Sequence, residues 1–248
     1  MRFEKPVWVD EMPSTNTPLI EKIERGEPLH DGYVLATHWQ TAGRGQGDRI
    51  WIARPGRDLC FSFAIQTNTP MRQLTSLSMA AALAVAECVE SLGVSQPQTK
   101  WPNDAQVQGR KIAGILPELP EGDADTQRTV VVGVGLNVRM TEQEADEIDQ
   151  PATSLFVETG NKFSPVHVLP DLLNMLEARL AVWSEHGFAG LREDWHNRCV
   201  GVGEQVVVKE GSEWLTGVLS GFGDAGQLLL DDGGPVREVW SGRLRTAG

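Results

Sequence analysis

The chain has 248 residues, 40% of them hydrophobic, which suits one large domain or a medium domain followed by a small one. Its 22 basic and 34 acidic side chains give a net charge of −12, the wrong sign for a protein that works on nucleic acid. The opening MRFEKPVWVDEM carries five charges and no apolar run long enough for a signal peptide or membrane span, so a cytoplasmic protein without a membrane partner is expected.

The first hundred residues alternate short strands with two helices. Alternating apolar residues predict the strands, and a polar start predicts the first helix, since Ser14, Thr15 and Asn16 are all good helix caps. The second helix is alanine-rich and ends at Gly93. The predicted strands are 6–12, 32–40 and 58–66, and the predicted helices are 13–26 and 74–93.

The next hundred residues complete a large domain. Residues 98–119 read as a hairpin with turn signals at 102–104 and 108–110, and the β-branched run 128–138 is typical of a buried central strand. The acidic stretch 141–149 predicts a solvated, partly helical surface. Leucines at helical spacing predict helix over 165–197.

From about Val202 the chain changes to short strands separated by glycine-rich turns. This pattern predicts a small SH3-like β-barrel, and we place the domains at 1–198 and 199–248. The predicted strands of the barrel are 204–210, 213–223, 227–233 and 236–242.

The three cysteines, Cys60, Cys88 and Cys199, are odd in number, far apart and match no metal-ligand spacing. A free cysteine behaves as a small hydrophobic residue, so reduced and buried side chains are expected. No cysteine nucleophile is implied.

Two stretches combine glycine or tight turns with charge. In GRGQGDRIW, residues 43–51, glycines let the backbone approach a ligand and arginine offers a planar fork for carboxylate or phosphate oxygens. An anion-holding loop is one interpretation, and a mobile surface loop is the other. In KWPND, residues 100–104, Asp104 could hold Mg²⁺ together with phosphate oxygens, and a salt-bridged turn is the alternative.

Two further stretches place polar groups on apolar strands. Lys111 of GRKIAGIL, residues 109–116, stands between small or apolar neighbours, where a lysine commonly extends its amine to water. In GVGLNV, residues 133–138, the glycines suggest close approach of a ligand and Asn137 could contact a base edge. A bulge with a satisfied asparagine is the alternative for this strand.

Together, and with PSTN at 13–16 ahead of them, the four stretches resemble the biotin protein ligases, also called biotin–[acetyl-CoA-carboxylase] ligases. The likeness runs from about Val7 to Trp195, includes ATSL at 152–155, and extends into the C-terminal strands. KWPND followed by GRKIAGIL is its most diagnostic part. The resemblance implies an α+β fold like that of the class II aminoacyl-tRNA synthetases, with a mixed, mostly antiparallel sheet, helices on one face, and the small barrel.

The resemblance also implies a set of site residues. The implied catalytic residues are Lys111 and Arg44. The implied biotin-binding residues are Ser14, Thr15, Asn16, Gln40, Gly43, Arg44, Gly45, Lys111, Gly114 and Gly133. The implied ATP- and adenylate-binding residues are Arg44, Arg49, Trp51, Asn103, Lys111, Gly135 and Asn137, and Asp104 is the implied Mg²⁺ ligand.

The family's reaction explains these roles. The biotin carboxylate attacks the α-phosphate of ATP, giving biotinyl-5′-AMP and pyrophosphate, and a lysine of a biotin carboxyl carrier domain then displaces AMP. By resemblance, Ser14 and Thr15 bind the ureido head, Lys111 meets the carboxylate and the activating phosphate, and Trp51 stacks with adenine. The resemblance also implies that Gly114, Gly133 and Gly135 leave room for the ring systems.

The glycine loop departs from the pattern of many bacterial members, which read Gly-Arg-Gly-Arg-Arg-Gly-Arg and carry four positive charges. Here Arg44 and Arg49 against Asp48 leave a net charge of +1. We hypothesise that this loop clamps the adenylate less tightly, with compensation by Arg54 or Arg57.

Several alternatives stay open at this point. A lipoate or octanoate ligase shares the general fold, and a non-catalytic biotin- or nucleotide-sensing module could keep the fold without turnover. The short segment before Ser14 leaves no space for a helix-turn-helix, so a monofunctional ligase is expected. A monomer and a homodimer are equally compatible with the sequence.

Overall fold

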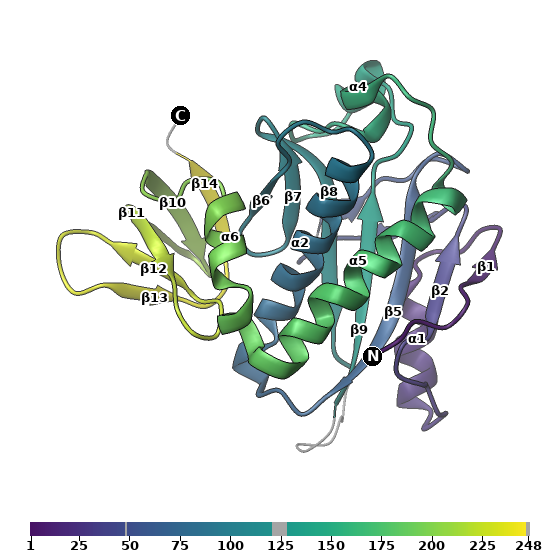
Figure 1. Cartoon of the computed structure of the whole chain (residues 1–248), viewed down its shortest axis with the longest axis horizontal. Coiled ribbons are helices and arrows are strands. Elements are labelled where there is room, and N and C mark those ends of the chain that lie inside the picture. The colour runs from purple at the N-terminus through teal and green to yellow at the C-terminus, as the bar shows by residue number, and fades with distance from the viewer. Residues whose placement is uncertain (48, 121–127, 247–248) are drawn as a thin grey trace.

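The computed structural model describes residues 1–47, 49–120 and 128–246, and its centre is a seven-stranded sheet (Figure 1). Strands β1 and β2 run parallel, and every other neighbouring pair is antiparallel. The strands, in their order across the sheet, are β1 (Val7–Val9), β2 (Val34–Thr37), β5 (Leu59–Thr67), β9 (Arg128–Leu136), β8 (Arg110–Glu118), β7 (Asp104–Val107) and β6 (Gln98–Lys100). The predicted mixed, mostly antiparallel sheet is confirmed.

The centre of the sheet is the long pair β5 and β9, which align from Leu59 opposite Leu136 to Thr67 opposite Arg128. The valines of β9 are buried because helices cover both faces of the sheet there. On β9, Gly133 and Gly135 point to the same face, since alternate residues of a strand share a face. This face carries the site described below.

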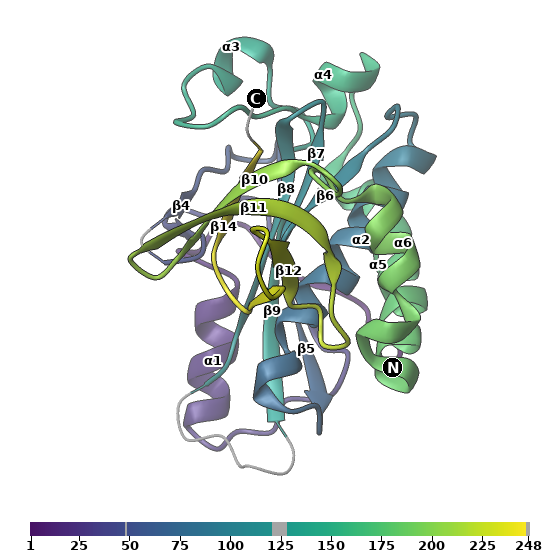
Figure 2. The ribbon, with the colours of Figure 1, turned by 90° about the vertical axis from the view of Figure 1, so that its left-hand side faces the viewer.

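Helices α2 (Thr75–Ser91) and α5 (Pro165–His186) cover one face of the sheet, whereas α1 (Asn16–Glu24) packs on the opposite face (Figure 2). The expected layer of helices on one face is therefore α2 and α5, and α1 adds a second layer. Among the described residues one helical stretch, Met71–Ser91, is apolar and long enough to cross a membrane by composition alone. Of its most apolar 18-residue window, 78% is buried inside the protein, where the helix packs against the sheet and α5, which accounts for its apolar composition.

The C-terminal part is a five-stranded antiparallel sheet. Its strands, in order across the sheet, are β13 (Arg237–Val239), β12 (Leu228–Asp231), β11 (Glu213–Phe222), β10 (Gln205–Glu210) and β14 (Arg243–Thr246). Four strands were expected, and β14 is the addition: Leu244 is its one buried residue, so the segment lacks a clear alternating signal. The small sheet agrees with the predicted SH3-like fold.

The two sheets share one hydrophobic core, because buried residues of both belong to a single cluster. Val200 N donates to Thr99 O at 3.0 Å, and Trp101 Nε1 donates to Gly226 O at 3.1 Å, so the KWPND turn contacts the C-terminal part directly. The division of the chain at residues 198 and 199 stays a prediction.

The remaining elements are short. The predicted hairpin at 98–119 is three strands, because both turn signals are used, and the predicted helix at 165–197 is interrupted after His186 by Gly187. A capping box at Thr141 and Glu144 starts the helical part of 141–149. These elements are β3 (Gly43–Arg44), β4 (Ile50–Trp51), η1 (Met71–Gln73), α3 (Glu142–Ala145), α4 (Leu155–Thr159), η2 (Gly187–Gly190) and α6 (Arg192–Arg198).

Candidate active site

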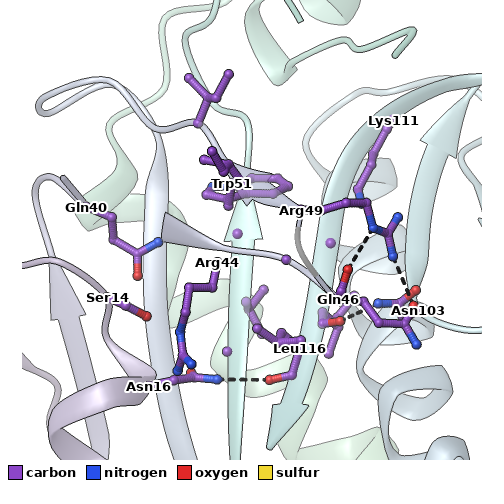
Figure 3. Close-up of a pocket in the computed structure, with 18 of the residues that line it drawn as sticks. Ser14, Asn16, Gln40, Arg44, Gln46, Arg49, Trp51, Asn103, Lys111 and Leu116 are labelled. Carbon is purple, nitrogen blue, oxygen red and sulfur yellow. Dashed lines mark hydrogen bonds between the residues drawn. The ribbon is translucent and has the colours of Figure 1, made fainter. Parts of the chain in front are cut away.

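A pocket of about 420 Å³ lies over β8 and β9, between the N-terminus of α1 and the β3–β4 hairpin (Figure 3). This size is typical of a small-molecule site. Most of the predicted site residues line it: Ser14, Thr15, Asn16, Gln40, Arg44, Gly45, Arg49, Trp51, Asn103, Lys111, Gly114, Gly133 and Gly135. Gly43, Asp104 and Asn137 are the predicted residues outside this lining.

One end of the pocket is a chain of buried polar side chains, which we call the polar end: Gln40, Thr15, Ser62 and Asn16. The Thr15 backbone N–H donates to Gln40 Oε1 at 2.8 Å, and the Thr15 hydroxyl donates to the same oxygen at 3.2 Å. Ser62 Oγ lies 2.6 Å from Thr15 Oγ1 and 2.5 Å from Asn16 Oδ1. Because Gln40 Oε1 is held by two donors, its amide nitrogen is left to donate into the pocket, where Figure 3 shows it pointing.

The polar start of α1 was predicted to cap that helix, and this prediction is wrong. Thr15 occupies the cap position but makes no capping hydrogen bond through its side chain. Its hydroxyl and the Asn16 amide turn to the polar end of the pocket instead. The same residue types that favour a helix start therefore serve a site here, since Asx and Thr side chains hydrogen-bond equally well to other partners.

Gly133 is required at the polar end by the close approach of Asn16. A Cβ at position 133 would lie 2.5 Å from Asn16 Oδ1 and 3.1 Å from its Cγ. Asn16 is 2% exposed, so it has little freedom to move aside. The space above Gly133 is filled by a protein amide, which corrects the expectation that this glycine makes room for a ligand ring.

The opposite end of the pocket contains Lys111, whose Nζ lies 2.6 Å from Asp104 Oδ1 and 5.8 Å from the centre of the Trp51 ring. The Trp51 indole lies directly over Gly135, where a Cβ would overlap the ring, and touches the space above Gly114. These two glycines therefore make room for Trp51 and Lys111. A nucleotide base that stacks on Trp51 must use the other face of the indole.

The strand that carries Lys111 is fixed by the ATSL segment. Lys111 N donates to Pro151 O at 2.8 Å, and Thr153 N donates to Lys111 O at 2.9 Å. Asn137 is 4% exposed and its Nδ2 donates to Thr153 O at 2.9 Å. The structure thus places Asn137 behind Lys111 as a satisfied asparagine that supports this segment.

Positive charge gathers at the Lys111 end although the whole chain is acidic. Burial lowers the pKa of the Lys100 amine, Asp104 opposes this, and the nearby charges of Arg243, Lys111 and Arg245 lower it further. Arg243 lies on β14 and lines the pocket, so the C-terminal sheet contributes to the site. The sequence signal at Arg243 was only one more basic residue in a short, polar strand.

Arg44 lies beside Asn16 and Leu116, at the opposite end of the pocket from Lys111 (Figure 3). Its Nη2 donates to Glu118 Oε2 at 2.8 Å. The two predicted catalytic cations are therefore each paired with a carboxylate, and they approach the pocket from opposite ends. Glu118 was missed by the motif analysis because it stands two residues beyond the end of GRKIAGIL.

The rest of the glycine loop is held mainly by its own contacts. Gly45 N donates to Arg49 O at 2.7 Å, and Arg49 donates to the Gln46 backbone and side chain. Asp48, on which the predicted net charge of the loop depends, lies outside the described residues.

The suggested compensation by Arg54 or Arg57 is not supported. Arg54 Nε lies 3.1 Å, and Arg57 Nη1 2.6 Å, from the same Glu144 oxygen. Both guanidinium groups are thus engaged with α3, and neither lines the pocket.

The described residues contain no cluster of three or more His, Cys, Asp or Glu side chains that could hold a metal ion by themselves. Asp104, the predicted Mg²⁺ ligand, has its carboxylate against Lys111. A magnesium ion that accompanies a nucleotide needs only one or two carboxylates in addition to phosphate oxygens, so this arrangement fits an ion brought by ATP.

The cysteines are free and buried, as expected. Burial raises the pKa of Cys88 and of Cys199 to about 12, and raises that of Cys60 as well. Thiols that stay protonated are poor nucleophiles, so the described site uses no cysteine.

Comparison with known proteins adds independent findings. A family model described as the biotin/lipoate A/B protein ligase family matches residues 8–137. The biotin–[acetyl-CoA-carboxylase] ligase of Mycobacterium tuberculosis is 35% identical over 92% of this chain and 84% of its own length. The bifunctional ligase/repressor BirA of Bacillus subtilis is 29% identical over 95% of this chain and 72% of its own length. A biotin protein ligase from Aquifex aeolicus in complex with biotin and ATP superimposes with a TM-score of 0.84, at 28% identity, covering 99% of this chain and 100% of that one.

Proposed function

The chain belongs to the biotin/lipoate A/B protein ligase family, and on that premise we propose that it is an ATP-dependent biotin–[acetyl-CoA-carboxylase] ligase. It activates biotin as biotinyl-5′-AMP and transfers the biotinyl group to a lysine of a carboxyl carrier domain. The relatives named as biotin ligases and the similar structure that holds biotin and ATP support this assignment.

The observation that carries the proposal is the division of one pocket into a buried polar end and a cationic end. Biotin has the matching chemistry, with a ureido ring at one end and a carboxylate at the other. Gln40 offers an amide nitrogen and Ser14 a hydroxyl at the polar end. At the other end, Lys111 stands where the acid would meet ATP.

Adenylation needs positioning and positive charge more than covalent help from the protein. Lys111 neutralises charge on the attacking carboxylate and on the α-phosphate, while Asp104 holds the lysine amine in place before substrates arrive. Arg44 contributes a second cation from the opposite end of the pocket, where Glu118 pairs with it. Mg²⁺, when bound with ATP, supplies further neutralisation of the phosphate oxygens.

Transfer of the biotinyl group also needs no side-chain nucleophile, because a lysine amine on the carrier attacks the mixed anhydride and AMP leaves. The chain's part is to keep water from the anhydride until the amine arrives. The β3–β4 hairpin, which carries Trp51, lines the pocket and in this proposal covers the adenylate. The proposal includes a carboxyl carrier domain as the acceptor of the biotinyl group. It also includes a monomer or a homodimer as the active oligomeric state.

A lipoate or octanoate ligase fits the pocket less well. The head of either acid is apolar, whereas Thr15, Asn16 and Gln40 are buried polar side chains at the end where that head would lie. Desolvating such groups without a hydrogen-bonding ligand is unfavourable. A competition between biotin and lipoate for adenylation separates the two acids.

The proposal is tested by ATP–pyrophosphate exchange that depends on biotin. We expect exchange with the wild-type chain and none with Lys111→Ala, which should keep its fold because Lys111 is a partly exposed side chain beside the pocket. A purified, folded wild-type chain that binds biotin but gives no exchange would favour a sensing module instead. Normal exchange by the Lys111→Ala variant would remove the role assigned to that lysine.

A further inference from the structure

Glu118, the last residue of β8, joins two parts of the pocket that are far apart in the sequence. Its Oε2 accepts a hydrogen bond from Asn16 Nδ2 at 2.6 Å and another from Arg44 Nη2 at 2.8 Å. The Glu118 side chain is 24% exposed and that of Arg44 is 44% exposed. One carboxylate thus connects the start of α1 with the β3–β4 hairpin.

Glu118 helps to decide which way the Asn16 amide faces. Asn16 Nδ2 donates to Leu116 O at 3.1 Å as well as to Glu118, so both of its N–H groups have acceptors on β8 (Figure 3). Asn16 Oδ1 is consequently turned toward the Ser62 hydroxyl at 2.5 Å. The order of donors and acceptors along the polar end depends on this orientation.

Glu118 also fixes the Arg44 guanidinium. Over residues 1–47, 49–120 and 128–246, Glu118 is the one acceptor that Arg44 is seen to contact. A guanidinium presents five N–H groups in a rigid planar fork, so anchoring one edge orients the others. Arg44 lines the pocket, and its guanidinium lies beside Asn16 at the polar end (Figure 3).

We propose that Glu118 is a positioning residue that holds Arg44 and the Asn16 amide in the orientation that binds biotin at the polar end of the pocket. This inference rests on the proposed function of the pocket. The carboxylate restricts the Arg44 side chain before any substrate binds. Less conformational entropy is therefore lost when biotin enters the pocket. The negative charge of Glu118 stabilises the Arg44 guanidinium, whereas the Asn16 amide requires only an acceptor oxygen.

The two roles can be separated by substitution. Glu118→Gln keeps an acceptor oxygen for Asn16 and removes the charge that holds Arg44, whereas Glu118→Ala removes both. Biotin affinity is measured without ATP by following tryptophan fluorescence. We expect the dissociation constant to rise about tenfold in Glu118→Gln, as for loss of one charge-assisted hydrogen bond, and further in Glu118→Ala.

Glu90→Gln is the matched control, because Glu90 forms a partly exposed ion pair with Arg198 and lies outside the pocket lining. It should bind biotin as the wild type does. A purely structural role for Glu118 would lower the unfolding temperature without a selective effect on biotin binding, so both quantities are measured.

A double-mutant cycle with Arg44→Ala decides whether Glu118 acts through Arg44. If it does, Glu118→Gln causes no further loss of affinity in the Arg44→Ala background. Wild-type affinity in Glu118→Gln, or the same tenfold loss with and without Arg44, would overturn the inference. A wild-type chain that binds biotin without ATP–pyrophosphate exchange would overturn only the proposed function, because the effect of Glu118 is measured on binding.

Discussion

Replacing Gly133 by alanine should damage the polar end of the pocket and the stability of the fold together. The added Cβ would lie 2.5 Å from Asn16 Oδ1, a distance that requires one of the two to move. Gly133 is not among the glycines with positive φ, so the effect is steric and not a backbone preference. Asn16 cannot move freely, because its amide is bonded to Ser62, Leu116 and Glu118.

The magnitude follows from these contacts. Overpacking a well-packed site costs about 1–3 kcal/mol, and each displaced hydrogen bond about 1 kcal/mol more. A loss of roughly 2–4 kcal/mol lowers the unfolding midpoint of a chain of this size by roughly 5–15 °C. Biotin affinity should fall at least about tenfold, since moving the Asn16 amide disturbs the chain of hydrogen bonds from Gln40 to Glu118.

The assay combines denaturant or thermal unfolding with biotin titration. Gly234→Ala is the control, because position 234 is an exposed turn where the nearest atom to a Cβ is the end of the Asp232 side chain at 3.3 Å. In an Asn16→Ala background the Gly133→Ala cost should shrink toward zero, since the opposing amide is gone. Unchanged stability and affinity in Gly133→Ala, or an equal cost in both backgrounds, would refute the reasoning.

Three further predictions concern the C-terminal sheet, the glycine loop and the cysteines. Arg243→Ala should raise the KM for ATP about tenfold without changing biotin affinity, because Arg243 lines the cationic end of the pocket. The control is Arg237→Ala, on β13. An equal effect of both substitutions would contradict a role of Arg243 in ATP binding. If the loop clamps the adenylate loosely, the enzyme with biotin and ATP should label a non-cognate protein more than an arginine-rich relative does, and equal labelling would remove the idea. Burial raises the pKa of Cys88 and Cys199 to about 12, whereas unfolded thiols have a pKa of about 8.5. As the pH rises, the unfolded chain therefore loses these protons before the folded chain does. The free energy of unfolding should therefore fall above about pH 9, by about 1.4 kcal/mol per pH unit for each thiol, and a Cys199→Ala variant that shows the same slope would contradict the assignment.

Much of the architecture follows from local pattern. The run at 128–138 is rich in valine and typical of a buried central strand, and the alanine-rich segment ending at Gly93 is typical of a helix. Motif spacing also brought most of the site together, since PSTN, the glycine loop, Lys111 and the glycines of β9 line one pocket. Each of these signals lies within a few neighbouring residues.

Other assignments depended on partners that sequence spacing does not reveal. Asn137 carries the same amide whether it faces a nucleotide or the carbonyl of Thr153, and only packing distinguishes the two. Arg54 and Arg57 looked available to the pocket, but α3 supplies a carboxylate that engages both. The glycines at 133 and 135 were expected to admit a ligand, and the groups that approach them are the protein's own Asn16 and Trp51.

The sequence alone determined the order of most helices and strands, the family and the identity of most pocket residues, because these are properties of local periodicity and short motifs. Only the tertiary structure decided that Glu118 meets both Asn16 and Arg44, and that Arg243 reaches the Lys111 end of the pocket. Those contacts join residues up to a hundred or more positions apart, so they are fixed by strand register and by the packing of one sheet against another. No local pattern contains that information.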